Sequence, residues 1–140
     1  MSKLLQRLSD PSRSGVYRTS RAEPVIDALR GSRLDLAKIS LRSVRDRDTL
    51  LKTLALALGF PDWFGGNWDA LEDCLADLSW RGTEGHVIVF EDSRLSDDLG
   101  ILLDILASSA ESWAARGKPF FAVFVDPQQM LALAELFRER

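Results

Sequence analysis

Residues 53–80 hold the side chains of this sequence that are most able to do chemistry. The segment contains no Lys or Arg, and it carries three of the four tryptophans. Its carboxylates give it a charge of -5 in a chain whose total is -3, so the rest of the sequence sums to +2. The acidity is therefore local, and it predicts a docking surface for a basic partner. The carboxylates are Asp62, Asp69, Glu72, Asp73 and Asp77.

Four of these carboxylates belong to one predicted helix over Asn67–Trp80. Apolar residues recur there at i, i+3, i+4 and i+7 and predict a buried stripe, which leaves the carboxylates facing outward. Asp69/Asp73 and Asp73/Asp77 are like-charged i,i+4 pairs, each costing roughly 0.2–0.5 kcal/mol in an isolated helix. The sequence accepts this repulsion without a local lysine, which favours a cationic partner. The predicted stripe is Leu71, Cys74, Leu75 and Leu78.

The loop before this helix, Phe60–Asn67, is predicted to present aromatic side chains. Its two glycines can adopt backbone conformations that other residues rarely adopt, and Asn67 is suited to cap the helix. Trp63 and Phe64 lie within ten residues of Asp73, and interface hot spots commonly join aromatic anchors to charge-assisted hydrogen bonds. A solubilising face is the simpler interpretation of an acidic helix alone. The combination with aromatic residues favours a protein-binding surface.

Alternating strand and helix patterns are expected to position this surface. Segments rich in β-branched and aromatic residues predict strands, and apolar stripes between them predict helices. This alternation implies a mainly parallel sheet with right-handed crossovers, so the fold class is α/β. The three predicted strands are Leu34–Leu41, Val87–Phe90 and Phe120–Val125, and Val16–Arg18 is a candidate fourth strand at the N-terminal edge.

The predicted helices have recognisable start and stop signals. Asp46 or Asp48 caps a helix that ends before Gly59, and Ser96 caps a long helix that ends at Gly117. Three further helices are predicted: Lys3–Leu8, Pro24–Arg30, and a last helix that opens at Asp126 and Pro127 and carries Met130, Leu131, Ala134 and Phe137.

Length and composition predict one globular domain, because 140 residues with 46% apolar content can bury a core. We expect residues 1–15 to be a partly flexible extension and residues 16–140 to be a single domain with an added C-terminal helix. The apolar runs fall short of the roughly 18 residues that span a bilayer. Cys74 is the only cysteine, and no signal-peptide pattern is found, so the cytoplasm is the expected location.

The loop and the acidic helix together resemble the signature segment of the barstar family of intracellular ribonuclease inhibitors. The resemblance rests on the unbroken order Phe60-Pro-Asp-Trp-Phe-Gly-Gly-Asn-Trp-Asp-Ala-Leu-Glu-Asp-Cys-Leu75. It implies a small α/β fold with a three-stranded parallel sheet, the number of strands that the residue patterns also predict. It further implies a one-to-one inhibitor of a basic ribonuclease or nuclease-like toxin, of the antitoxin or immunity type, with no catalysis, cofactor or metal.

The resemblance also implies which residues bind the partner. In the family, the loop and helix plug a ribonuclease active site, and carboxylates stand in for RNA phosphate. Asp73 resembles the dominant acidic contact and Asp69 the second, while Trp63 falls where an aromatic covers a catalytic histidine. A carboxylate can accept two parallel hydrogen bonds from a guanidinium, so a phosphate-binding arginine cluster suits Asp73. The predicted partner-binding residues are Trp63, Gly65, Asn67, Asp69, Glu72 and Asp73, with Glu72 standing where barstar has a tryptophan.

Two other functions use the same acidic segment. In a metal-dependent hydrolase, Asp69, Asp73 and Asp77 would serve as metal ligands or as general acid and base, although no nearby histidine completes a site. A non-inhibitory adaptor would use the same acidic face to hold a partner without an active site.

Direct nucleic-acid binding and catalysis by His86 are disfavoured. Seven Lys and Arg residues lie in the first 33 positions, but they are spread out, and the overall pI of about 5.2 opposes binding to phosphate. His86 is the only histidine, and no sequence around a Ser or Cys has the form of a nucleophile elbow. We therefore expect a monomer whose partner is a protein rather than a nucleic acid or a membrane.

Overall fold

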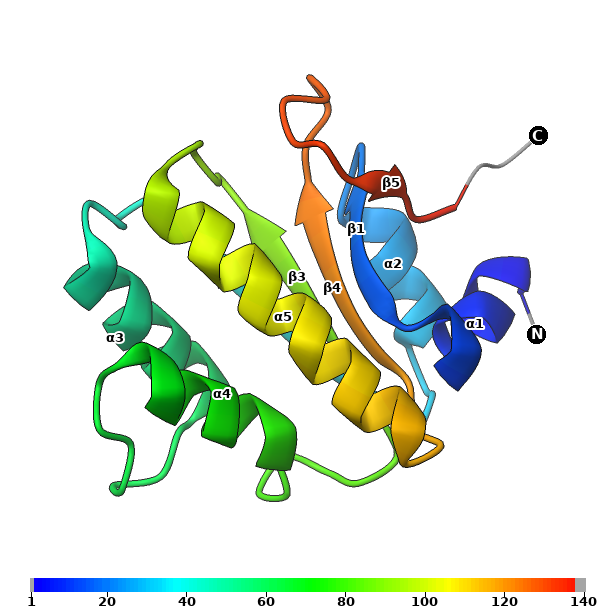
Figure 1. Ribbon diagram of the computed structural model, residues 1–140. Coiled ribbons are helices and arrows are strands. Elements are labelled where there is room, and N and C mark those ends of the chain that lie inside the picture. Colours follow the sequence, from blue (N-terminus) through cyan, green and yellow to red (C-terminus); the bar gives the residue numbers. More distant parts are fainter. Residues whose placement is uncertain (1, 138–140) are drawn as a thin grey trace.

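A computed structural model describes residues 2–137 as a parallel β-sheet covered by helices (Figure 1). The strand order is β2-β3-β4-β1-β5, and every neighbouring pair is parallel. This arrangement confirms the α/β class and the parallel sheet. Within the described residues the strands are β1 (Gly15–Thr19), β2 (Asp35–Ser40), β3 (His86–Glu91), β4 (Phe120–Val125) and β5 (Ala134–Glu135).

Helices cover both faces of the sheet, as a parallel sheet requires. In β3 and β4, alternate side chains point to opposite faces, and both sets are buried. One face packs against α3 (Arg47–Leu58), α4 (Trp68–Asp77) and α5 (Asp97–Ala115). The other packs against α1 (Lys3–Leu8) and α2 (Glu23–Leu29), and the 3-10 helix η1 (Pro11–Arg13) precedes β1. None of the described helices combines the length and hydrophobicity that a membrane crossing requires.

The three helices on the first face begin where the sequence predicts. The Asp46 carboxylate and the Thr49 side chain form a reciprocal capping box at α3, and Gly59 ends that helix in the left-handed conformation at φ 64°. Asn67 caps α4 and Ser96 caps α5 through side-chain oxygens. These contacts join residues three apart, so the local sequence is enough to specify them.

The sheet has two more strands than the predicted three. The candidate edge strand Val16–Arg18 lies within β1, but β1 is interior to the sheet, between β4 and β5. Its position follows from pairing along its whole length with β4, which lies far along the chain. The edge beside β1 is instead taken by β5, in the region predicted as a helix.

The predicted C-terminal helix is wrong because Asp126 closes a turn instead of capping a helix. Its carboxylate accepts hydrogen bonds from the backbone amides of Met130, at 3.0 Å, and Leu131, at 2.8 Å. The chain then turns back along β1, where the Leu136 amide donates to the Arg18 carbonyl at 2.9 Å. Residues 138–140 of the predicted domain, and Met1 of the predicted extension, lie outside the described residues.

This C-terminal segment connects the two hydrophobic cores. Leu131 is buried with α3, α4 and α5, whereas Leu136 is buried with α1 and α2 on the opposite face. Between them the Leu133 carbonyl accepts from Arg18 Nε at 3.2 Å. The segment therefore fastens the edge of β1 to both layers.

Leu136→Ala should lower the free energy of unfolding by about 2–5 kcal/mol, the usual range for a buried leucine replaced by alanine. The side chain is only 1% exposed, so its removal leaves a cavity between β5 and the α1/α2 layer. Urea unfolding followed by circular dichroism measures the change. Met130→Ala is the matched control, because Met130 is 59% exposed in the same segment. Equal effects of the two substitutions would contradict the bridging role of Leu136.

Candidate functional site

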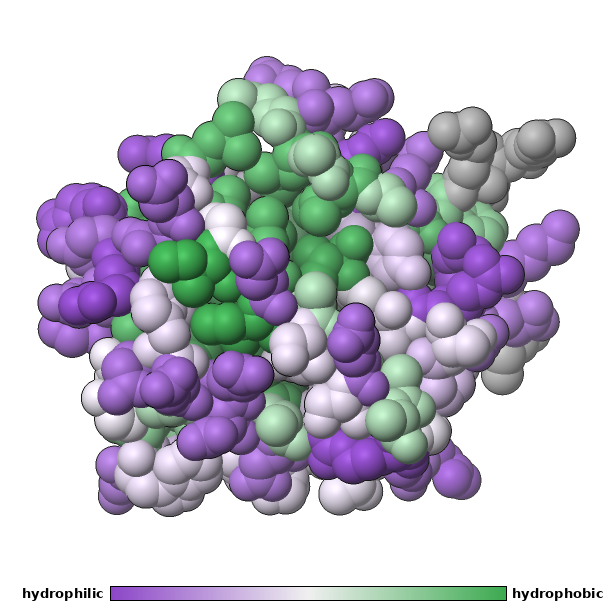
Figure 2. Space-filling model, viewed as in Figure 1, coloured by the Kyte–Doolittle hydropathy of each residue, from purple (hydrophilic) through white to green (hydrophobic). Residues whose placement is uncertain are grey.

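The predicted partner-binding residues all lie on the molecular surface, along the loop 59–67 and helix α4. Trp63 is 58% exposed, a large value for a tryptophan. In the view of Figure 2, hydrophilic residues gather over α3 and α4, while hydrophobic residues gather beside them over the first half of α5. The exposed members of the set are Trp63, Gly65, Asn67, Asp69, Glu72 and Asp73.

Helix α4 separates its carboxylates from its buried stripe. Leu71, Cys74 and Leu75 are fully buried, as is Leu78 at the C-cap, which confirms the predicted stripe. The helix ends at Asp77, earlier than predicted. Burial, together with the charges of Asp73 and Asp77, raises the pKa of the Cys74 thiol to about 11. The thiol is therefore a packing group with no reactive thiolate at neutral pH.

The acidic surface, which we define as Asp69, Glu72, Asp73 and Asp77, is exposed and unneutralised. Among the described residues, none of these carboxylates has a Lys, Arg or His partner within 4.0 Å. Glu72 accepts a long hydrogen bond of 3.4 Å from Ser108 on α5. Within residues 2–137, no group of three or more His, Cys, Asp or Glu is arranged to hold a metal ion. The negative charge is thus free to meet a cation from outside.

Aromatic packing holds the loop that carries Trp63. The Phe60 ring lies 4.9 Å from Phe64 and 6.1 Å from Trp80, between ring centroids. The Trp80 indole nitrogen donates to the Leu58 carbonyl at 2.9 Å, at the end of α3. Phe60 and Phe64 pack against the hydrophobic core. Trp63 is thereby the aromatic side chain of this loop that is left exposed.

Both ends of α4 are held by side chains. At the N-terminus, the Asn67 side chain accepts from the Ala70 amide at 2.8 Å. At the C-terminus, Trp113 Nε1 donates to the Leu75 carbonyl at 2.8 Å, and Arg116 Nη2 donates to the Ala76 carbonyl at 2.7 Å. The sequence predicts the first contact. It does not predict the hydrogen bond of Trp113, because residue spacing gives the face of a helix but not the direction of an indole N–H.

A partly buried polar cluster lies beneath the C-terminal ends of α4 and α5. Asp35 forms a bidentate ion pair with Arg81, at 2.8 and 3.2 Å, and its Oδ2 lies 3.0 Å from His86 Nδ1. Burial alone raises the pKa of Asp35, but the hydrogen bonds from His86 and Arg81 outweigh it and hold the pKa below its ordinary value. The His86 ring packs against Trp113, with centroids 4.8 Å apart. His86 is fully buried, which fits a structural role.

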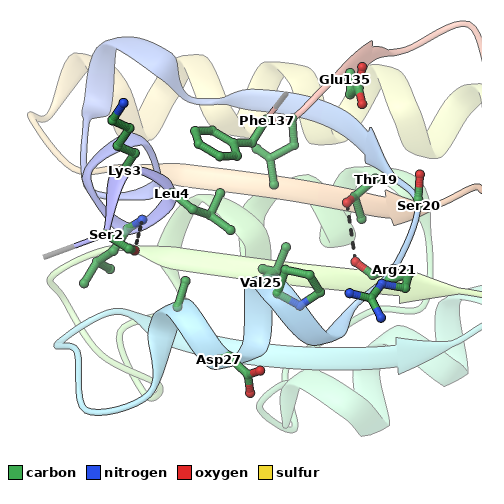
Figure 3. A pocket seen from close by; sticks show the side chains of 14 residues that line it. Ser2, Lys3, Leu4, Thr19, Ser20, Arg21, Val25, Asp27, Glu135 and Phe137 are labelled. Carbon is green, nitrogen blue, oxygen red and sulfur yellow. Dashed lines mark hydrogen bonds between the residues drawn. The ribbon is translucent and has the colours of Figure 1, made fainter. Parts of the chain in front are cut away.

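A large hollow of the structure does not coincide with the acidic surface. It measures about 1040 Å³ and lies between α1, α2 and the side of the sheet formed by β1 and the edge strand β5 (Figure 3). Leu4, Val25 and Phe137 line its middle, and the Asp27 carboxylate, which pairs with Arg30 at 3.2 Å, points away from it. No residue of the predicted partner-binding set lines this hollow.

Comparison with protein families identifies the segment that contains the acidic surface. The family model described as Barstar (barnase inhibitor) matches residues 34–125. This range includes α3, the loop, α4 and three strands, β2, β3 and β4. The three-stranded expectation thus describes the matched part of the sheet, and β1 and β5 lie outside it. The comparison with curated proteins finds no match.

Asp35→Asn should make the stability less sensitive to acid. Because the pKa of Asp35 is lowered in the fold, its ionised form contributes stability above the unfolded value of about 3.9. That contribution is lost as the pH falls through the lower folded pKa. Urea unfolding between pH 7 and pH 2 should therefore show a lower free energy of unfolding for the variant than for wild type near neutrality. This difference should close as the pH falls.

Asp62→Asn is the control for this titration, because Asp62 is exposed and has no ion pair among the described residues. Its stability curve should follow that of wild type. A difference between Asp35→Asn and wild type that stays constant down to pH 2 would show that ionisation of Asp35 adds no stability.

Proposed function

This chain belongs to the barstar family, and on that premise we propose that it inhibits a basic ribonuclease or nuclease-like toxin. It binds the enzyme one to one and covers its active site, and it has no catalytic activity of its own. The observation that carries this proposal is the exposed acidic surface of α4, which forms no ion pair among the described residues, together with the exposed Trp63 on the loop that precedes it. A ribonuclease must present cations to bind RNA phosphate, and the acidic surface is complementary to them.

The helical geometry arranges the two principal carboxylates as a row of anions. Asp69 and Asp73 are four residues apart, so they share a face and are separated by about 6 Å along the axis. A guanidinium can bind each carboxylate through two parallel hydrogen bonds. Docking also relieves the repulsion between the two aspartates, because each acquires a cationic neighbour. The pair therefore imitates consecutive charges of a polynucleotide backbone.

Trp63 adds the apolar part of the interface. Aromatic anchors close to charge-assisted hydrogen bonds are typical of hot spots, since the ring excludes water from the polar contacts. The packed aromatic loop keeps Trp63 exposed before the partner arrives, which reduces the ordering cost of binding. Gly65 and Asn67 lie on the same loop, close enough in sequence to share the contact.

Asp73→Ala should weaken inhibition more than any other single carboxylate substitution on α4. Close charge pairs across such interfaces couple by roughly 1.5–7 kcal/mol, so we expect a loss of several kcal/mol, and a smaller loss for Asp69→Ala. The measurement is a titration of ribonuclease activity, with barnase as the first enzyme because the family description names it. Glu23→Ala, on the opposite layer, is the control and should bind as wild type does.

Wild-type affinity of Asp73→Ala for an enzyme that the native protein inhibits would rule out the proposed mechanism. If barnase is not inhibited, a pull-down from cell extract should compare wild type with the Asp69→Ala/Asp73→Ala double variant. A captured protein whose ribonuclease activity is blocked supports the proposal. A captured partner without an active site would instead identify an adaptor, and metal-dependent turnover by this protein would identify a hydrolase.

The association rate should fall as salt rises, with little change in the dissociation rate. Complementary charges accelerate encounter, and ions screen them over about 10 Å at 0.1 M ionic strength. Stopped-flow mixing at increasing sodium chloride measures both rates. The Asp69→Ala/Asp73→Ala variant should show a shallower salt dependence. A rate that does not respond to salt would contradict steering by the acidic surface.

A further inference from the structure

Helix α4 is electrostatically unfavourable as an isolated element. Asp73 and Asp77 repel each other at i,i+4 spacing, and Asp77 is the last helical residue, where the helix dipole disfavours an anion. The C-cap is Leu78 in the left-handed conformation, at φ 49°, which a side chain with a Cβ adopts at a cost. The contacts that stabilise this end of the helix must therefore come from elsewhere in the fold.

Two side chains at the C-terminal end of α5 supply those contacts, Trp113 in its last turn and Arg116 at its C-cap. The last carbonyls of a helix have no intrahelical amide to accept from. Trp113 and Arg116 donate to two of them, on Leu75 and Ala76, through the 2.8 and 2.7 Å hydrogen bonds described above. The positive charge of Arg116 also lies at the negative end of the helix dipole. It forms no ion pair within 4.0 Å with an α4 carboxylate, so the acidic surface keeps its charge.

These two donors are themselves fixed in place. The guanidinium carbon of Arg116 lies 3.9 Å from the centre of the Trp113 ring, as in a cation–π contact. His86 packs against the same ring, and Asp35 binds His86. Trp113 is 3% exposed, so water does not replace its hydrogen bond. The C-terminal end of α4 is thus connected through Trp113 to His86 on β3 and Asp35 on β2.

We propose that Trp113 and Arg116 are positioning residues for the acidic surface. Their hydrogen bonds to α4 act within the protein and do not themselves contact the bound enzyme. They fix the end of α4 so that Asp69 and Asp73 are presented in one orientation before binding, which lowers the ordering cost of association. The role of this orientation in binding rests on the proposed function. The restraint on α4 is a property of the free protein and is testable without a partner.

Amide hydrogen exchange of the free protein tests the restraint. Trp113→Phe keeps an aromatic side chain, with a smaller ring, but removes the indole N–H donor, so the buried Leu75 carbonyl loses its partner. We expect amides in the last turn of α4 to exchange about tenfold faster, the effect of losing one such hydrogen bond. Amides of α3 should keep their wild-type rates.

Trp80→Phe is the matched control, because the Trp80 indole makes the same kind of contact with the last turn of α3, at the Leu58 carbonyl. This variant should accelerate exchange at the end of α3 and leave α4 protected. Should Trp113→Phe fail to fold, Arg116→Ala applies the same test from an exposed position, and Arg116→Lys should restore part of the protection. Faster exchange spread evenly over all helices, or unchanged exchange in α4, would overturn the proposal.

A binding measurement with barnase separates the positioning role from the proposed function. Trp113→Phe should weaken binding about tenfold in the wild-type background and clearly less in the Asp73→Ala background, because it acts through the placement of Asp73. Equal weakening in both backgrounds would contradict that route. If wild type binds no ribonuclease while α4 is still selectively loosened, the proposed function fails and the restraint on α4 stands.

Discussion

Repulsion along α4 is the constraint around which this structure is organised. Three aspartates at four-residue intervals share one helix, and none is paired with an internal cation among the described residues. Such a helix is destabilised in isolation, because like charges at i,i+4 and an anion at its C-terminus both raise its free energy. Its apolar stripe, its Asn67 cap and the donors Trp113 and Arg116 offset these costs without neutralising the acidic surface.

The sheet separates the acidic helix α4 from most elements that lie outside the matched family segment. One face of the sheet carries α3, α4 and α5, and the additions to the matched family segment lie on the other face or at the side of the sheet formed by β1 and β5. β1 and β5 widen the sheet, and the Asp126 turn ties them to both cores. These additions enlarge the buried core without covering α4 or the loop.

Rigidity and exposure are combined at the aromatic loop. Phe60, Phe64 and Trp80 pack together, and the Trp80 indole closes the end of α3, while Trp63 is left at the surface. The C-terminal ends of α3 and α4 are therefore stabilised by the same kind of contact, a hydrogen bond from an indole N–H to a carbonyl of the last turn. Because the loop begins where α3 ends, and the C-terminal end of α4 is fixed separately, the aromatic and acidic parts of the surface are both ordered before a partner binds.

The sequence by itself determined the α/β class, the acidic helix, the caps at Asp46, Asn67 and Ser96, and the family. The helix, the caps and the family signature depend on residues close together in the chain, and the class depends on the order in which such local patterns follow one another. The tertiary structure decided the rest. Asp126 and Pro127 have the composition of a helix start, but pairing with β1 draws the following residues into a strand. The burial of His86 and the hydrogen bond of Trp113 with α4 likewise depend on residues brought together from distant parts of the chain. Local propensity does not encode such contacts, since folding specifies them only when the layers pack.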